Sequence, residues 1–294
     1  MNLTLALLRD QAFWFLTEFA FRIIRRLRII LKGNRYFNQG RHSSDSDATP
    51  YSKSITIMLV NKKSFSKFRR KMAYREILEH LSYQDGKRYL DRIQSLVKAE
   101  EATCLIELNR RNDFFGKPVT FSYGKYGRIA PTTLRYISTA LEVANHLRLN
   151  PTTSVVEIGC GYGGQAAVLN RMFGIRNYTC FDLPPVLELI ERYLAEVSDL
   201  EIQRGDLSEK AYKWDLVISN YAFSELRRDL QIRYLENVLL KSASGFMIMN
   251  SGLTNKTGRS TGKLTITEIR EFLPNLKIVE EIPLTGPDNY VILW

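Results

Sequence analysis

The chain has 294 residues, of which 45% are hydrophobic and 25% charged, enough for one large folded domain and a smaller addition. The net charge of +11 is concentrated near the start, because residues 1–41 hold eight basic residues against two acidic ones. The remainder is only mildly basic, which argues against a body that coats nucleic acid. Three cysteines without CxxC spacing argue against a disulfide framework and fit a reducing cytosol.

The first 36 residues predict a basic amphipathic helix. Arg9, Asp10, Glu18 and Arg22 interrupt each apolar run before it reaches the length of a membrane span. No basic leader and no small-residue cleavage pattern indicate a signal peptide. At helical spacing the charged residues gather on one side and the apolar ones on the other. Such a helix either lies on an anionic membrane surface through residues 1–32 or packs on its own domain or a second subunit. The expected location is cytoplasmic, including the inner face of a membrane.

Residues 37–54 are rich in Ser, Asp, Gly and Pro and predict a polar linker. Residues 55–130 predict a helical cap followed by a substrate loop. Apolar residues recur at helical spacing between residues 62 and 108, whereas residues 109–130 mix Asn, Gly, Pro and aromatics without a period. Pro131 is expected to start a helix, which Asn150-Pro151 ends.

Strands and helices alternate from residue 152 onward, so residues 131–294 predict one α/β domain. The fold class is a Rossmann-like, doubly wound, mostly parallel sheet preceded by the helical cap. Its end differs from the usual dinucleotide fold. Apolar runs at residues 277–284 and 290–294 are too close for a parallel crossover, so they must form a C-terminal antiparallel hairpin.

A glycine-rich turn separates the first predicted strand of this domain from a helix. The run Gly159-x-Gly161-x-x-Gly164 allows a nucleotide-like ligand to approach bare backbone amides at a helix N-terminus. Glu157, two residues before the first glycine, suits a cationic ammonium group and would repel a pyrophosphate. Asp182 ends the next strand, where an acid binds both ribose hydroxyls. Asp206 follows the third strand, in place to bond an adenine amino group. These features favour S-adenosylmethionine over NAD.

Together these motifs resemble the class I S-adenosylmethionine-dependent methyltransferases. Residues 156–165, 181–184, 219–226 and 281–289 further resemble the sugar O-methyltransferase family of glycan and antibiotic-sugar gene clusters. The resemblance covers roughly residues 112–294. It implies methyl transfer to a sugar hydroxyl of a glycan or its precursor. The cofactor-binding residues are then Glu157, Gly159, Gly161, Gly163, Asp182, Leu183, Asp206, Leu207 and Asn220.

The acceptor side is expected where the fourth strand ends, at residues 219–225. A sugar hydroxyl needs a base or a metal to take up its proton. Glu225 is the leading candidate base, although an acid also suits a helix N-terminus. Asn220 is a catalytic or cofactor contact, and His146 is a further candidate base. The expected substrate-binding residues are Tyr123, Arg135, Tyr221 and Phe223.

A metal has little support in the sequence, which lacks HxH, HExxH or a dense Asp cluster, and it is not excluded. Asp229 stands four residues after Glu225, where the two could form a metal pair, but pairing with Arg233 is favoured.

Three rival functions stay open. A nucleic-acid methyltransferase is disfavoured because the turn Asn220-Tyr-Ala-Phe223 lacks the prolines usual in enzymes that methylate base nitrogens. A non-catalytic, membrane-held scaffold is disfavoured by the complete cofactor motifs. An NAD oxidoreductase is disfavoured by Glu157 and the hairpin.

Overall fold

The computed structural model describes residues 51–208, 212–250, 262–286 and 289–294. The predicted basic helix of residues 1–36 and most of the predicted linker lie outside these residues. All of the described residues belong to one compact unit. None of the helices within the described residues combines the length and apolarity needed to cross a bilayer.

The helical cap is present, and it begins earlier than expected. Residues 51–54, predicted as linker, form the first turn of helix α2 because Tyr51 and Ile55 are buried together on its inner side. A capping box between Ser82 and Asp85 starts helix α5. The helices of the cap are α2 (Tyr51–Val60), α3 (Lys62–Phe65), α4 (Met72–Arg75), α5 (Tyr83–Leu96) and α6 (Ala99–Asn109).

The predicted substrate loop is partly ordered. Strands β1 (Phe121–Ser122) and β2 (Arg128–Ile129) form a small antiparallel ladder around a 3-10 turn. Helix α7 (Pro131–His146) then begins at the predicted proline and ends before Asn150-Pro151. This helix leads into the central sheet.

A seven-stranded sheet forms the centre of the unit, in the order β5-β4-β3-β6-β7-β9-β8. All neighbouring pairs are parallel except those made by β9, which runs antiparallel to both β7 and β8. The strands are β3 (Ser154–Ile158), β4 (Asn177–Phe181), β5 (Gln203–Arg204), β6 (Trp214–Asn220), β7 (Ser242–Met249), β8 (Lys277–Glu280) and β9 (Tyr290–Leu293). This confirms the Rossmann-like doubly wound fold and its terminal hairpin.

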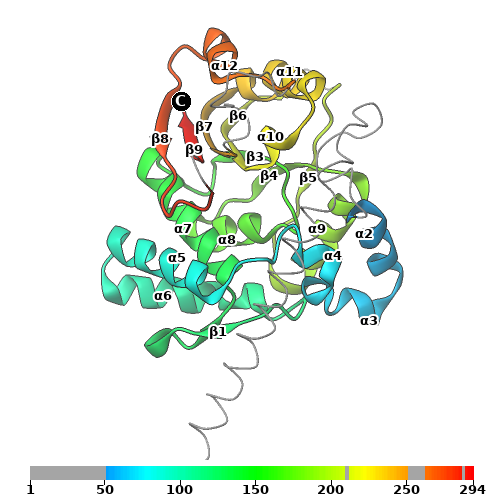
Figure 1. The fold of residues 1–294 in the computed structure, drawn as a ribbon, viewed down its shortest axis with the longest axis vertical. Coiled ribbons are helices and arrows are strands. Elements are labelled where there is room, and N and C mark those ends of the chain that lie inside the picture. Colours follow the sequence, from blue (N-terminus) through cyan, green and yellow to red (C-terminus); the bar gives the residue numbers. More distant parts are fainter. Residues whose placement is uncertain (1–50, 209–211, 251–261, 287–288) are drawn as a thin grey trace, which may run out of the picture. The chain divides into compact units, whose positions relative to one another are not determined.

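Helices cover both faces of the sheet (Figure 1). On one face lie α7, α8 (Gly164–Phe173) and α9 (Pro184–Val197), and on the other lie α11 (Arg228–Asn237) and α12 (Ile266–Phe272). Two alternate residues of β3, Val156 and Ile158, face α11 and α12 and pack in the hydrophobic core with Leu235 and Ile269. Glu157, which stands between them in the strand, points to the opposite face of the sheet, beside Tyr178.

The segment after β6, residues 222–241, is not one continuous helix. It consists of α10 (Ala222–Glu225), α11 and a 3-10 turn at Leu239–Lys241. Leu226 and Arg227 are extended between α10 and α11. Glu225 and Asp229 therefore do not share a helix face.

Candidate functional site

The glycine loop between β3 and α8 is packed closely on both sides. Gly159 has φ +76°, and a Cβ added there would lie 2.0 Å from the Cβ of Ala222. A Cβ on Gly161, at φ +61°, would lie 3.2 Å from the side chain of Leu78, so the cap reaches this loop. Gly163 adopts φ +83° as the residue before α8. The predicted glycines are thus required by both backbone conformation and space.

Glu157 is buried beneath this loop with 1% of its surface exposed. The hydroxyl of Tyr178 donates to its Oε2 at 2.7 Å. Burial raises the pKa of the Glu157 carboxyl to about 8, although this hydrogen bond opposes the shift. In the free protein, then, Glu157 is held by a phenol, and a cationic ligand close by would favour its ionised form.

Asp182 ends β4 beside the glycine loop. Its carboxylate accepts hydrogen bonds from the backbone N–H of Leu183 at 2.8 Å and of Gly161 at 3.2 Å. Burial nevertheless raises the pKa of Asp182 to about 6. Leu183 caps the start of α9. The acid that the sequence assigns to the ribose therefore already touches the predicted loop.

Asp206 and Leu207 follow β5 at the same edge of the sheet. Asp206 is exposed, and its Oδ1 accepts from the N–H and the hydroxyl of Ser208, both at 2.8 Å. These bonds hold its pKa below the usual range. Leu207 packs partly against the hydrophobic core. Asp182 and Asp206 therefore both lie at the carboxyl edge of the sheet, because they follow the neighbouring parallel strands β4 and β5.

The turn after β6 carries the backbone strain of this edge. Tyr221 has φ +71°, a conformation rare for a residue with a bulky side chain. Its N–H donates to Ile248 at 2.8 Å, and its hydroxyl donates to Glu281 and lies 3.0 Å from the Thr285 hydroxyl. The preceding residue, Asn220, is half-buried, and its Oδ1 accepts no hydrogen bond. The turn therefore presents an unsatisfied amide oxygen beside a tyrosine held in place.

Phe223 and Glu225 diverge within α10. Phe223 is fully buried in the core between the sheet and α11, so it does not form the predicted wall of an acceptor site. Glu225 is half-buried, and its Oε1 accepts from Asn250 Nδ2 at 3.2 Å. Burial raises the pKa of the Tyr51 hydroxyl, and the charges of Asp182 and Glu225 raise it further, so both carboxylates lie in the neighbourhood of Tyr51.

Arg135 is brought to the same edge by the second turn of α7. It is 7% exposed and lies over the ring of Tyr136 at 5.3 Å. Burial lowers the pKa of Arg135, but the phenols of Tyr136, Tyr89 and Tyr221 raise it by more. Two predicted substrate residues, Arg135 and Tyr221, therefore lie in the same neighbourhood. Tyr123 does not join them, because its ring stacks on Tyr83 at 5.1 Å.

The structure places two other predicted residues elsewhere. His146 is exposed at the last residue of α7, about 22 Å from Pro131 at 1.5 Å per helical residue. Its ring lies 6.4 Å from that of Phe246 in β7. The expected pair of Asp229 with Arg233 is wrong: Asp229 pairs at 2.6 Å with Arg227, the residue just before α11.

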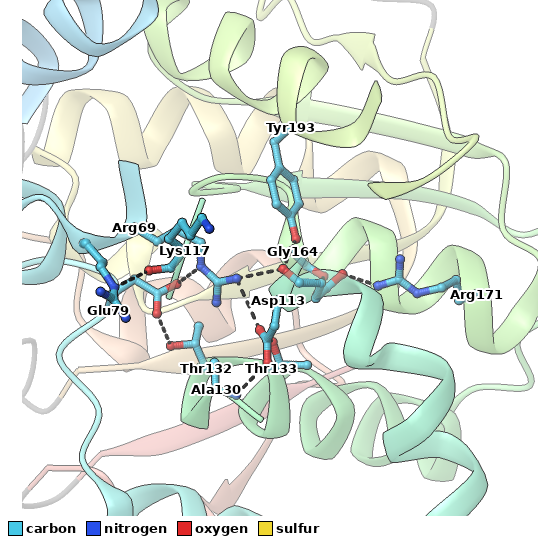
Figure 2. A network of polar contacts seen from close by, with 12 residues as sticks. Arg69, Glu79, Asp113, Lys117, Ala130, Thr132, Thr133, Gly164, Arg171 and Tyr193 are labelled. Carbon is cyan, nitrogen blue, oxygen red and sulfur yellow. Dashed lines mark hydrogen bonds and ion pairs between the residues drawn. The ribbon is translucent and has the colours of Figure 1, made fainter. Parts of the chain in front are cut away.

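A buried polar network joins the cap to the glycine loop (Figure 2). The side chain of Arg69 is fully buried and donates to Glu79 at 2.5 Å, to the Asn112 carbonyl at 2.7 Å and to Asp113 at 3.3 Å. Asn112 in turn donates to the carbonyl of Gly164 at 3.0 Å. The cation also lies 4.6 Å from the ring centre of the loop's Tyr162.

The same network fixes the start of α7. Asp113 accepts from the N–H of Ala130 at 2.6 Å and from the Thr133 hydroxyl at 2.7 Å, and Glu79 accepts from the Thr132 hydroxyl at 3.0 Å. Acids at a helix N-terminus are favourable. Because Arg135 stands a few residues further on, this network positions it.

No motif in the sequence points to Arg69, Glu79, Asp113, Tyr51, Tyr89 or Glu281 as functional residues. Tyr51 falls within the predicted linker, and Glu281 lies in one of the family-like segments. The charged residues of the network stand 10 and 44 positions from Arg69, and no local spacing signals such a pairing.

No group of three or more potential metal ligands occurs within residues 51–208, 212–250, 262–286 and 289–294. This finding leaves a metal open. Cys160, within the glycine loop, is buried, and its thiol donates weakly to the Glu157 carbonyl at 3.2 Å.

Comparison with known proteins gives matches only among solved structures. No known protein family matches the sequence, and neither does any curated protein. Geranyl diphosphate C-methyltransferase from Streptomyces coelicolor is 15% identical with a TM-score of 0.40, over 53% of this chain and 76% of that one. The PH0226 protein from Pyrococcus horikoshii is 15% identical with a TM-score of 0.41, over 55% and 90%. An O-methyltransferase family 2 protein from Planctomyces limnophilus is 17% identical with a TM-score of 0.39, over 54% and 56%. Likenesses this remote carry no argument about the reaction, so the function must be argued from the site.

Proposed function

We propose that this chain is an S-adenosylmethionine-dependent O-methyltransferase acting on a sugar hydroxyl of a glycan or glycan precursor. The observation that carries the proposal is the set of groups at the carboxyl edge of β3, β4 and β6. They are the glycine loop, the carboxylate of Asp182 and the unsatisfied amide oxygen of Asn220. Cofactors bind at this edge of such sheets.

The residues fit the proposed cofactor. Asp182 would accept from the two ribose hydroxyls, and Asp206 would accept from the adenine amino group. Asn220 Oδ1 would accept from the ammonium of the methionine part, and Glu157 beneath the loop would add negative potential. When bound, S-adenosylmethionine supplies a methyl group on a positively charged sulfur.

Glu225 is the proposed general base. The acceptor oxygen would form its bond to the methyl carbon as the carbon–sulfur bond breaks, and the hydroxyl proton would pass to the Glu225 carboxylate. The products are the methyl ether, S-adenosylhomocysteine and a protonated Glu225. The amide of Asn250 fixes the carboxylate at 3.2 Å.

The proposal that the acceptor is a sugar rests on the segments that resemble the sugar O-methyltransferase family. The best test is to measure transfer of a labelled methyl group to candidate acceptors. Full-length protein is incubated with methyl-labelled S-adenosylmethionine and a panel of nucleotide-sugars, glycan oligomers, RNA and DNA. We expect label on a sugar, and none from Asp182→Ala, while Asp199→Asn, whose ion pair with Arg176 is exposed, stays active. Label on RNA or DNA alone would replace this function with the nucleic-acid alternative.

We also propose that residues 1–32 hold the enzyme at an anionic membrane surface. The support is the basic and apolar division of that segment.

A further inference from the structure

Arg135 is a buried cation without a counter-charge. It is 7% exposed, and its Nε has no hydrogen-bond acceptor. No carboxylate of the described residues forms an ion pair with it; the buried cation of the cap, Arg69, by contrast has Glu79 and Asp113. An unpaired buried charge is costly, which makes a purely structural role for Arg135 unfavourable.

Its surroundings offer phenols rather than carboxylates. Tyr89 is 4% exposed, and its hydroxyl lies beside that of Tyr221, whose own proton is donated to Glu281. Burial raises the pKa of Tyr89, and the two nearby acids whose charges raise it further, Glu281 and Asp85, already accept hydrogen bonds from other groups. Glu281 accepts from Tyr221 and from the N–H of Thr285 at 2.9 Å, and Asp85 accepts from Ser82 and Arg88. A buried guanidinium whose Nε lacks an acceptor and a buried phenol therefore lie together beside the turn after β6.

We propose that Arg135 and Tyr89 bind an anionic group, a carboxylate or phosphate, of the methyl acceptor. This inference rests on the proposed function and narrows its substrate to an acidic sugar, such as a uronic acid or a sugar phosphate. Guanidinium binds such groups through charge-assisted hydrogen bonds. The phenols around Arg135 come from α5, from α7 and from the turn after β6. The variants below distinguish binding of the acceptor from binding of the cofactor's carboxylate.

The test measures binding, so that it does not depend on turnover. Full-length protein, with and without saturating S-adenosylhomocysteine, is titrated with glucuronate, glucose 1-phosphate and neutral glucose, and the affinities are followed by ligand-observed NMR. We expect one of the acids to bind about tenfold or more tightly than glucose. Arg135→Gln should abolish this preference, Arg135→Lys should keep part of it, and the exposed control Arg176→Gln should keep all of it. Tyr89→Phe should reduce it severalfold.

Thermal melting separates a binding role from a structural one. Because Arg135 is buried unpaired, Arg135→Met should melt at or above the wild-type temperature, whereas loss of a structural cation would lower it. Three results overturn the proposal: equal binding of acids and glucose, an unchanged preference in Arg135→Gln, or a loss in Arg135→Gln of S-adenosylmethionine affinity alone, which would assign Arg135 to the cofactor's carboxylate. If acids bind through Arg135 and the cofactor does not bind at all, the proposed function fails and the anion site stands.

Discussion

Asp182 offers a direct link between the structure and cofactor affinity. Ribose hydroxyls donate to a carboxylate, so binding requires the ionised form. Because burial raises the pKa of Asp182 to about 6, it is ionised at pH 7.5 and mostly protonated at pH 5. At pH 5 roughly one carboxyl in ten is ionised, so S-adenosylmethionine should bind about tenfold more weakly than at pH 7.5.

Asp182→Asn keeps the shape and one acceptor oxygen but removes the charge. A hydrogen bond to a charged group contributes about 1.5–3 kcal/mol, so the variant should lose roughly 10- to 150-fold in affinity at pH 7.5. Titration calorimetry from pH 5 to 7.5 should show that wild-type affinity for S-adenosylmethionine changes with pH around a midpoint near 6. The affinity of Asp182→Asn should not show this change. Glu157→Gln is the matched control and should retain that midpoint. An Asp182→Asn variant with wild-type affinity and pH dependence would refute the ribose assignment.

The other predictions concern the loop, the buried acid, the base and the N-terminal segment. Gly159→Ala should lower stability by about 3 kcal/mol in denaturant unfolding, since its Cβ would lie 2.0 Å from Ala222 at φ +76°; an unchanged midpoint would contradict the packing. The pKa of Glu157 is raised to about 8, so its contribution to stability is complete below its ordinary pKa of 4.5 and is lost as pH rises through about 8. In the wild type, the free energy of unfolding should fall by on the order of 4 kcal/mol between pH 5 and pH 8. In Glu157→Gln this fall should largely disappear. If the variant's free energy of unfolding fell with pH as steeply as that of the wild type, Glu157 would not be the titrating group. Glu225→Gln should lower kcat by about 10²–10⁴-fold with little change in KM, and intact turnover would remove Glu225 as the base. Full-length protein should sediment with anionic liposomes and a chain of residues 42–294 should not; equal partitioning would end the membrane proposal.

Local patterns predicted the centre of the molecule well. The strand–glycine–helix run, the alternation that follows and the closely spaced terminal strands each depend on a few adjacent residues, so the sheet and its antiparallel hairpin could be read from the sequence. The carboxyl ends of parallel strands meet at one edge, which is why Asp182, Asp206 and Asn220 were foreseen together.

What escaped prediction depends on contacts distant in sequence. The start of α2 is stabilised by burial of Tyr51 under the cap, which outweighs the polar composition around it. Tyr221 meets Glu281 across 60 positions, and Arg69 meets Asp113 across 44. The break after Glu225 separates Glu225 and Asp229 onto different helices, and Asp229 pairs with Arg227 instead of the expected Arg233.

The central claim is that the carboxyl edge of β3, β4 and β6 binds S-adenosylmethionine. Titration calorimetry of the full-length protein with S-adenosylmethionine, S-adenosylhomocysteine and NAD tests it most directly. The account predicts one site for the first two ligands, with a Kd on the order of 10 μM, and no binding of NAD. Binding of NAD, or no binding of either sulfur ligand, would contradict it.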